Sequence, residues 1–428
     1  MRLFRFLLLH RLATRVAAAL ALILAGVGFL LLIAQDQETV RARSEIAADD
    51  PAFVDYVASL VGASPTNGDR YTALVNGDRI FPPMLAAIRG ARRRISFETY
   101  IFEEGQLGER FAAELIGAAR RGVQVRIVVD AVGSQAIGGD IPERLSAAGC
   151  RIAVFNPFHW YSLEEVNYRT HRKVLVADGE RAFIGGAGIA DHWLGDAQDA
   201  DHWRDTQVEV EGPAVRLLEA AFYHHWLEVG GETAPTLDAP PPAAGAARAV
   251  ILWSSPAAGI SNIKLLYLLT IAAARRTLDI QTPYFITDES TMWALDEAVR
   301  RGVRVRLLVE GDITDAKAVK FASRAAYERL LERGISISEY QRSMMHAKVV
   351  IADGTWTLVG SANFDNRSLE LNDELNAGIA DVDLARQLSG QFEADLGRSR
   401  RLDLEAWRRR PRLERLREKF WSYFSEVF

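Results

Sequence analysis

Two copies of one short polar pattern combine residue types that can do chemistry. Each copy has the spacing His-x-Lys-x-x-x-x-Asp, and the members are His171, Lys173 and Asp178 in the first copy and His346, Lys348 and Asp353 in the second. A histidine can act as a nucleophile or as a general acid and base near neutral pH. A neighbouring lysine can offset negative charge that develops in a transition state. The pattern therefore indicates chemistry that two parts of the chain perform together.

The alternative explanation is a buried strand that happens to have polar ends. Residues i and i+2 of a strand share one face, so the histidine and lysine of each copy are expected on the same side. Residues 174–176 and 349–351 are apolar and predict that both strands are buried. Each aspartate precedes a glycine, which predicts a turn where a carboxylate binds backbone N–H groups. Two chance matches in a chain with eight histidines would be rare, so we interpret the pattern as functional.

The elements around the motifs are repeated as well. The segment "RRISFETYIF" at residues 93–102 resembles "RRTLDIQTPYF" at 275–285, and "ARRGVQVRIVVD" at 119–130 resembles "VRRGVRVRLLVE" at 299–310. Each half predicts a strand, an amphipathic helix, a second strand and then further strands. Alternation of this kind is typical of an α/β fold with a mixed or parallel sheet.

Residues 71–395 resemble the phospholipase D superfamily, and among its members the bacterial cardiolipin synthases. The resemblance rests on the paired motif and on "NYRTHRK", "WRDTQVEVEGPAV" and "GSANFDNRSLELNDELN". It implies two similar phospholipase D-like domains, each a mixed β-sheet flanked by helices, packed about a pseudo-two-fold axis. We place these domains at residues 71–232 and 249–395, on either side of a proline- and alanine-rich linker at 233–248.

The resemblance also implies how the six motif residues act. His171 would attack phosphorus and form a phosphohistidine intermediate, and His346 would serve as general acid and then as general base. Lys173 and Lys348 would bind the non-bridging oxygens. The motif aspartates complete the catalytic set in the family. The two halves are nearly symmetric, so the sequence leaves the reverse assignment of the histidines open.

Further residues of the site follow from the same resemblance. Ser361 and Asn363 occupy positions that help to bind phosphate in the family, but the first half has Gly186 and Gly188 there. Backbone N–H groups could bind phosphate at these glycines, because glycine permits close approach.

The resemblance also assigns two acids to the histidines. Glu374, twenty-eight residues after His346, is expected to orient the imidazole of that histidine, and Asp205 is its counterpart in the first half. The resemblance implies neither a metal nor another cofactor. We interpret His224 and His225, on a helix that starts after Pro213, as helix-surface or hydrogen-bonded histidines in preference to metal ligands.

The N-terminus has the features of a membrane anchor. Residues 16–34, "VAAALALILAGVGFLLLIA", are uncharged and follow four arginines. As a helix they would be about 28 Å long, close to the thickness of the hydrocarbon core. We predict a transmembrane helix within residues 1–40, a connecting segment at 41–70, and a body on the extracytoplasmic side of a bacterial inner membrane. A cleaved signal peptide is the alternative.

Residues 396–428 predict a basic amphipathic tail. Residues 398–419 contain ten basic and four acidic side chains, and an apolar series with helical spacing consists of Leu413, Leu416, Phe420, Phe424 and Val427. Such a helix suits an anionic lipid surface, or it packs on the protein itself.

The function predicted from the sequence is transfer of a phosphatidyl group between phospholipids, with phosphatidylglycerol and phosphatidylethanolamine as candidate substrates. The net charge of −5 and the pI near 6 argue against a partner that is a nucleic acid. A phospholipase D hydrolase that releases phosphatidic acid is the main alternative. A metal-independent nuclease and a non-catalytic membrane scaffold are the others.

Overall fold

The computed structural model describes residues 14–18, 20, 21, 26, 39–157, 168–230, 237–254 and 261–424. The chain divides into two units, Met1–Val40 and Arg41–Phe428, and the second unit contains both motifs. Most of the span predicted at residues 16–34 lies outside the described residues. Within the described part of the chain, no helix combines the length and apolar character needed to cross a membrane.

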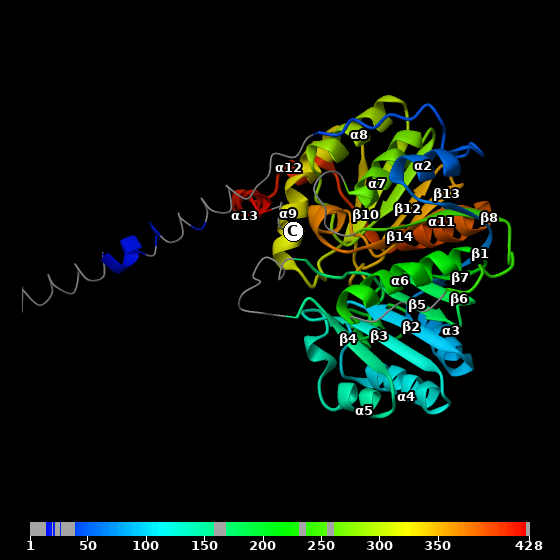
Figure 1. The fold of residues 1–428 in the computed structure, drawn as a ribbon. Coiled ribbons are helices and arrows are strands. Elements are labelled where there is room, and N and C mark those ends of the chain that lie inside the picture. Colours follow the sequence, from blue (N-terminus) through cyan, green and yellow to red (C-terminus); the bar gives the residue numbers. More distant parts are fainter. Residues whose placement is uncertain are drawn as a thin grey trace, which may run out of the picture. The chain divides into compact units, whose positions relative to one another are not determined.

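Among the described residues of the second unit, fifteen strands form a single sheet (Figure 1). The first half contributes β1 (Pro65–Val75), β2 (Arg94–Thr99), β3 (Gln124–Asp130), β4 (Arg151–Phe155), β5 (Val174–Ala177), β6 (Arg181–Gly185) and β7 (Thr206–Glu211). The second half contributes β8 (Ala247–Trp253), β9 (Thr277–Gln281), β10 (Arg304–Glu310), β11 (Ser336–Tyr340), β12 (Val349–Ala352), β13 (Trp356–Gly360) and β14 (Leu375–Ala380). The last strand is β15 (Ser399–Arg401).

The strand order repeats from one half to the other. From its outer edge the first half reads β4-β3-β2-β5-β6-β7-β1, and the second half reads β11-β10-β9-β12-β13-β14-β8, with β15 added at the edge. In both halves the three outer strands of this series are parallel, and the motif strand, β5 or β12, is antiparallel to its neighbours. The predicted mixed α/β fold is confirmed. Antiparallel pairing of β1 with β8 joins both halves into one sheet.

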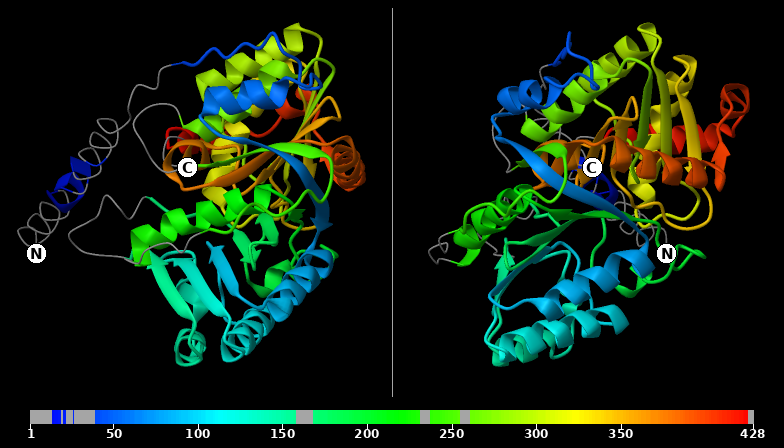
Figure 2. Two further views of the ribbon diagram at one scale, coloured as in Figure 1. Left: turned by 45° about the vertical axis from the view of Figure 1, so that its right-hand side comes forward. Right: turned by 90° about the vertical axis from the view of Figure 1, so that its right-hand side faces the viewer.

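Helices cover both faces of this sheet (Figures 1 and 2). The first half has α3 (Gly77–Gly90), α4 (Gln106–Arg120), α5 (Ile141–Ala147) and α6 (Ala214–Gly230). The second has α7 (Asn262–Ala273), α8 (Glu289–Arg300), α9 (Lys317–Ala325), α10 (Tyr327–Glu332) and α11 (Val382–Leu396). Helices α3 and α4 bury their apolar faces in one core, and α6 and α11 share a second core with strands of both halves. Burial of a shared apolar surface therefore holds the halves together, in addition to the sheet.

Residues 41–70, which the sequence predicts to be a connecting segment, contain a helix of their own. They include α2 (Phe53–Val61), which packs on the second half. The ring of Phe53 meets the ring of Trp356 edge to face, with 5.0 Å between centroids. The buried residues of "FVDYVASLV" have the spacing of an amphipathic helix. The partner of Phe53 could not be inferred, because it lies about 300 residues further along the chain.

The predicted tail consists of three elements. Strand β15 pairs with β11, and the short helix α12 (Leu404–Arg408) buries Trp407. Helix α13 (Arg412–Ser422) follows and packs against α9. The tail therefore extends the sheet of the second half before it reaches the amphipathic segment.

Candidate active site

The two motif strands hold their histidines and lysines at the start and their aspartates at the end. Asp178 accepts hydrogen bonds from the backbone N–H groups of Arg92, Arg93 and Arg94 at 2.7–3.0 Å. Asp353 accepts the three equivalent bonds at the start of β9, at 2.7–2.9 Å. Both aspartates have a positive φ, 55° and 54°. The structure thus places them at turns that fix the neighbouring strand, and it does not bring them into contact with the histidines.

Each histidine is hydrogen-bonded to a carboxylate of the other half. Nδ1 of His171 lies 3.0 Å from Oε1 of Glu374. Nδ1 of His346 lies 2.6 Å from Oδ2 of Asp205. All four residues are buried, with the two histidines 7% and 6% exposed. The expectation that Glu374 orients His346 was therefore wrong, because the carboxylates cross between the halves.

Backbone pairing at two isolated bridges produces this crossed arrangement. Thr170 pairs with Asp373, and the N–H of His171 donates to the carbonyl of Asp373 at 2.8 Å. Arg204 pairs with Met345, and the N–H of His346 donates to the carbonyl of Arg204, also at 2.8 Å. Each bridge brings a motif histidine next to the residue that precedes the opposite carboxylate.

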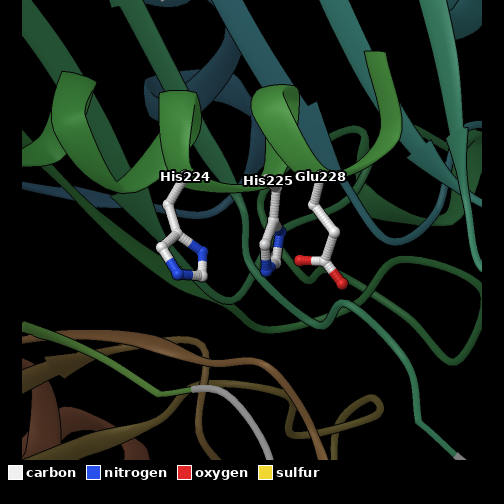
Figure 3. Close-up of side chains that lie close together, drawn as sticks. All are labelled: His224, His225 and Glu228. Atoms are coloured by element: carbon white, nitrogen blue, oxygen red, sulfur yellow. The ribbon is translucent and has the colours of Figure 1, made fainter. Parts of the chain in front are cut away.

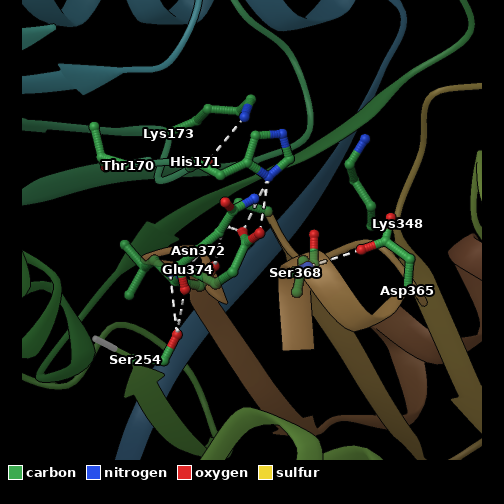
Figure 4. Close-up of polar contacts among 12 residues, drawn as sticks. Thr170, His171, Lys173, Ser254, Lys348, Asp365, Ser368, Asn372 and Glu374 are labelled. Carbon is green, nitrogen blue, oxygen red and sulfur yellow. Dashed lines mark hydrogen bonds and ion pairs between the residues drawn. The ribbon is translucent and has the colours of Figure 1, made fainter. Parts of the chain in front are cut away.

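In the second half, a serine holds the carboxylate of Glu374. Ser361 Oγ donates to Oε2 of Glu374 and accepts from the N–H of Leu375 at 3.0 Å. Ser254, just after β8, accepts from the N–H of Glu374 at 3.2 Å (Figure 4). Ser361 therefore acts on His171 through Glu374. Asn363, the other predicted phosphate-binding residue, is 7% exposed, and its Oδ1 accepts no hydrogen bond within the described part of the chain.

In the first half, a tryptophan instead of a serine donates a hydrogen bond to the acid. Trp193 Nε1 donates to Oδ2 of Asp205 at 2.9 Å. A Cβ atom at Gly186 would lie 2.3 Å from Oδ1 of Asp205, and one at Gly188 would lie 3.0 Å from the Trp193 ring. The two glycines thus make room for the acid and its indole. The N–H of Gly186 already donates to the carbonyl of Thr206 at 3.2 Å.

The two lysines lie beside the histidines of their own motifs. Lys173 Nζ donates to the carbonyl of His171 at 2.7 Å, and Lys348 Nζ donates to the carbonyl of His346 at 2.6 Å. Lys348 Nζ also lies 3.0 Å from Nε2 of His346. Burial, followed by the charge of Lys348, lowers the pKa of Lys173 to about 7. Burial lowers the pKa of Lys348 to about 8. Two cations in one buried site favour a bound anion.

Both histidines are neutral in the resting site. Burial lowers the pKa of His171 to about 4, although Glu374 acts in the opposite direction. Burial and then the charge of Lys348 lower the pKa of His346 to about 3. The charge of Lys173 also acts on His346, and that of Lys348 acts on His171, so the two motifs share one electrostatic environment. A neutral imidazole that donates from Nδ1 to a carboxylate carries a lone pair on Nε2.

Several residues of the site escaped the sequence analysis. The ring of Tyr100 meets the His171 ring edge to face at 5.3 Å and lies 5.5 Å from Lys173 Nζ. The ring of Trp203 lies 5.3 Å from that of His346. Burial raises the pKa of Asp365 to about 6. Tyr100 belongs to the repeated segment "RRISFETYIF", so the repeat contained a signal, but no spacing rule identifies which of its side chains faces the site.

A third buried histidine, His225, lies between two carboxylates next to the site. Nδ1 of His225 lies 2.6 Å from Oε1 of Glu98, and Nε2 lies 3.2 Å from Oδ1 of Asp373. Although burial disfavours its charged form, Glu98 raises the pKa of His225 above the ordinary value. Figure 3 shows His225 beside His224 and Glu228, three residues whose ligand atoms lie close enough to bind a metal. Both ring nitrogens of His225 already face carboxylates, so we interpret it as a structural bridge between the halves.

The sequence matches the family model described as "Cardiolipin synthase, PLD-like domain" at residues 84–226 and 267–396. It is 35% identical over 377 residues to a cardiolipin synthase of Geobacillus kaustophilus, which covers 87% of this chain and 75% of the relative. It is 34% identical over 396 residues to a probable cardiolipin synthase of Bacillus subtilis, covering 92% and 79% respectively.

Solved structures show the same fold at much lower identity. A phosphatidylserine synthase of Haemophilus influenzae aligns with a TM-score of 0.63 and 13% identity, covering 88% of this chain and 100% of that one. A polyphosphate kinase of Porphyromonas gingivalis aligns with a TM-score of 0.54 and 13% identity, covering 91% and 57%. The family model and the sequence relatives show that the chain belongs to the cardiolipin synthase family of proteins with phospholipase D-like domains.

Proposed function

We propose that the protein is a phosphatidyltransferase of the cardiolipin synthase type, which moves a phosphatidyl group from one phospholipid to a hydroxyl of another. The observation that carries this proposal is the pair of crossed dyads, His171 with Glu374 and His346 with Asp205, in one site that also contains two lysines. Two neutral imidazoles and two cations are the groups that a two-step displacement at a phosphodiester requires. Membership of the family supports the same reaction.

In the proposed first step, Nε2 of His171 forms a bond to phosphorus and the bond from phosphorus to the leaving oxygen breaks. Glu374 accepts the Nδ1 proton of His171 in a hydrogen bond, so the Nε2 lone pair is available. No described residue donates to Nε2 of His171, whereas Nε2 of His346 faces Lys348 at 3.0 Å. This difference supports His171 as the nucleophile.

His346 would transfer the protons in both steps. The negative charge of a bound phosphodiester raises the pKa of a nearby imidazole, so His346 would be protonated when substrate is present. It then gives its Nε2 proton to the leaving alkoxide. In the second step, neutral His346 takes the proton of the acceptor hydroxyl, and the new phosphorus–oxygen bond releases His171. Lys173 and Lys348 would hold the non-bridging oxygens throughout.

Phosphatidylglycerol is the proposed donor and acceptor, with phosphatidylethanolamine as a further candidate. The names of the relatives in Geobacillus and Bacillus support a cardiolipin product. The uncharged run at residues 16–34 supports an N-terminal anchor that keeps the body at a bacterial inner membrane, on the extracytoplasmic side. Both proposals describe an enzyme that meets its substrates in a bilayer.

The test is to incubate the full chain with phosphatidylglycerol vesicles and resolve the lipid products by mass spectrometry. We expect cardiolipin and free glycerol, also in the presence of a chelator. Phosphatidic acid without cardiolipin would identify a phospholipase D hydrolase, in which water takes the place of the acceptor. No lipid product from the wild type, with cleavage of DNA, would identify a nuclease.

A further inference from the structure

Helix α13 exposes its apolar side, which is the reverse of the usual arrangement in a helix packed on a globular body. Leu413, Leu416 and Phe420 are 69%, 65% and 54% exposed, and Tyr423 is 74% exposed. Their spacing of three and four residues places them along one side of the helix. Exposure of four large apolar or aromatic side chains in one stripe marks a surface that another apolar phase covers.

The opposite side of α13 is fixed to the body by a buried acid. Glu418 is 4% exposed. Its carboxylate accepts hydrogen bonds from Arg324 on α9 at 3.0 Å and from Arg410 at 2.9 Å. The guanidinium of Arg417 lies 5.2 Å from the centre of the Phe321 ring of α9. Five residues separate Glu418 from Leu413, about one and a half turns, so the attachment turns the apolar stripe away from the protein.

The charges along the stripe indicate which kind of surface covers it. Exposed basic side chains accompany the stripe, at positions Arg412, Arg415 and Lys419. The protein as a whole carries a net charge of −5, so this positive strip is local. Aromatic and aliphatic side chains flanked by basic ones suit the interface of an anionic bilayer, where the cations are attracted to the lipid headgroups.

Helix α13 is also close to the active site through α9. Ser323 Oγ, on α9, accepts from the N–H of Phe285 at 3.3 Å. The ring of Phe285 lies 4.9 Å from that of Phe364, which follows Asn363 of the site. Helix α13 lies beside α9 (Figure 1), so α9 and the segment at Phe285 lie between α13 and the loop that carries Asn363.

We propose that α13 is a built-in interfacial helix, which seats its exposed apolar stripe in the surface of an anionic lipid bilayer. The surface consists of Leu413, Leu416, Phe420 and Tyr423, with the flanking basic residues. This surface acts independently of the anchor predicted at residues 16–34, and it holds the second half against the lipid layer. The inference rests on the proposed function, in which the enzyme takes its phospholipid substrates from the same lipid layer.

The first experiment measures contact with lipid at single positions of the full chain, so that the N-terminal anchor does not obscure the result. Leu416→Cys is labelled with a small fluorophore, and Val382→Cys, an exposed apolar position at the start of α11, is the matched control. Cys150 is buried, and its burial raises the pKa of the thiol to about 11, so it resists labelling. Each protein is reconstituted in phosphatidylglycerol vesicles that contain brominated lipid.

We expect brominated lipid to reduce the fluorescence at Leu416→Cys about twofold and to leave Val382→Cys almost unchanged. The quenching should decrease in phosphatidylcholine vesicles and at high salt, because the basic residues then lose their partners. Equal signals at both positions would overturn the proposal. Disulfide formation between two unlabelled Leu416→Cys chains, together with no quenching of the labelled protein, would also overturn it, and would show that a second copy covers the stripe.

The second experiment connects the surface to turnover. Leu416→Ser with Phe420→Ser removes two apolar side chains from the stripe and should lower the turnover of vesicle lipid about tenfold. Cleavage of water-soluble bis(p-nitrophenyl) phosphate should be unchanged, because the stripe lies outside the site. Loss of both activities would point to a damaged fold and would count against the proposal. Quenching is measured without turnover, so it remains informative even if the lipid product is not cardiolipin.

Discussion

The two histidines differ in what faces their second ring nitrogen, and this difference can be tested. If His171 is the nucleophile, His346→Ala should still form phosphohistidine from a labelled p-nitrophenyl phosphodiester, because p-nitrophenolate leaves without a proton. His171→Ala should retain no label with any substrate. The measurement is label retained on protein after an alkaline quench that preserves phosphohistidine. Label on His346 in the His171→Ala protein would reverse the assignment.

The residues that hold the carboxylates should have separable effects. Ser361→Ala leaves Glu374 without its hydroxyl donor and should slow labelling of His171 about tenfold, since a bond to a charged group is lost. Trp193→Phe removes the indole donor of Asp205 and should slow phosphohistidine formation about tenfold only when the leaving group needs a proton, because His346 acts as base in the second step with either substrate. The measurement compares p-nitrophenyl and alkyl phosphodiesters for both variants. Equal losses on both substrates for Trp193→Phe would indicate general damage to the fold.

The lowered pKa values of the lysines predict how substrate binding depends on pH. Lys173 and Lys348 lose their charges as the pH rises through about 7 and about 8, well below the ordinary lysine range. A phosphodiester keeps its single negative charge over this window, so its KM should begin to increase above about pH 7 and increase more steeply above about pH 8, by at most about tenfold per pH unit for each lysine. In the Lys173→Arg variant this position remains charged, so its contribution to the pH dependence of KM should disappear. A KM that falls with rising pH would contradict the assignment of the lysines to phosphate.

At the level of elements, the motif aspartates fix the start of the adjacent strands. Each accepts three backbone hydrogen bonds from the start of the adjacent strand. Asp178→Ala and Asp353→Ala should each lower the free energy of unfolding by about 2–4 kcal/mol, because three backbone N–H groups lose their acceptor and alanine is strained at the positive φ of this turn. Denaturant unfolding measures the loss, and the matched Asp→Asn variants, which tolerate this φ, should lose less. Inactive Asp→Ala proteins of unchanged stability would instead indicate a direct catalytic role.

Elements that depend only on residues near one another in the sequence could be predicted. Strands β3 and β10 and helix α6 lie where apolar periodicity predicts them, and the turn at Asp178 follows from an aspartate before glycine. Pairings between distant segments could not be predicted in the same way. Helix α2 packs on a partner in the second half, and Glu374 bonds the histidine of the opposite half. Equivalent spacing within each repeat suggested the wrong histidine, because the contact depends on how the halves pack.

At the level of the whole molecule, the halves share one sheet and one apolar core. We therefore expect the body from Arg41 to Phe428 to unfold in a single cooperative thermal transition, despite its two similar halves. Differential scanning calorimetry of the full chain, compared with tyrosine and tryptophan fluorescence, makes the measurement. Two resolved transitions, with activity lost in the first, would show that the halves are independent folding units.

The crossed carboxylates also have a consequence for how such a duplicated gene can change. A mutation that removes the acid of one repeat disables the histidine of its sister and leaves its own histidine oriented. Neither repeat can therefore decay alone into a passive scaffold while the other keeps a working dyad. The repeats differ in these acids and their donors: Asp205 is held by the Trp193 indole, and Glu374 is held by the Ser361 hydroxyl. Because each acid bonds the histidine of the other repeat, each difference had to remain compatible with that histidine.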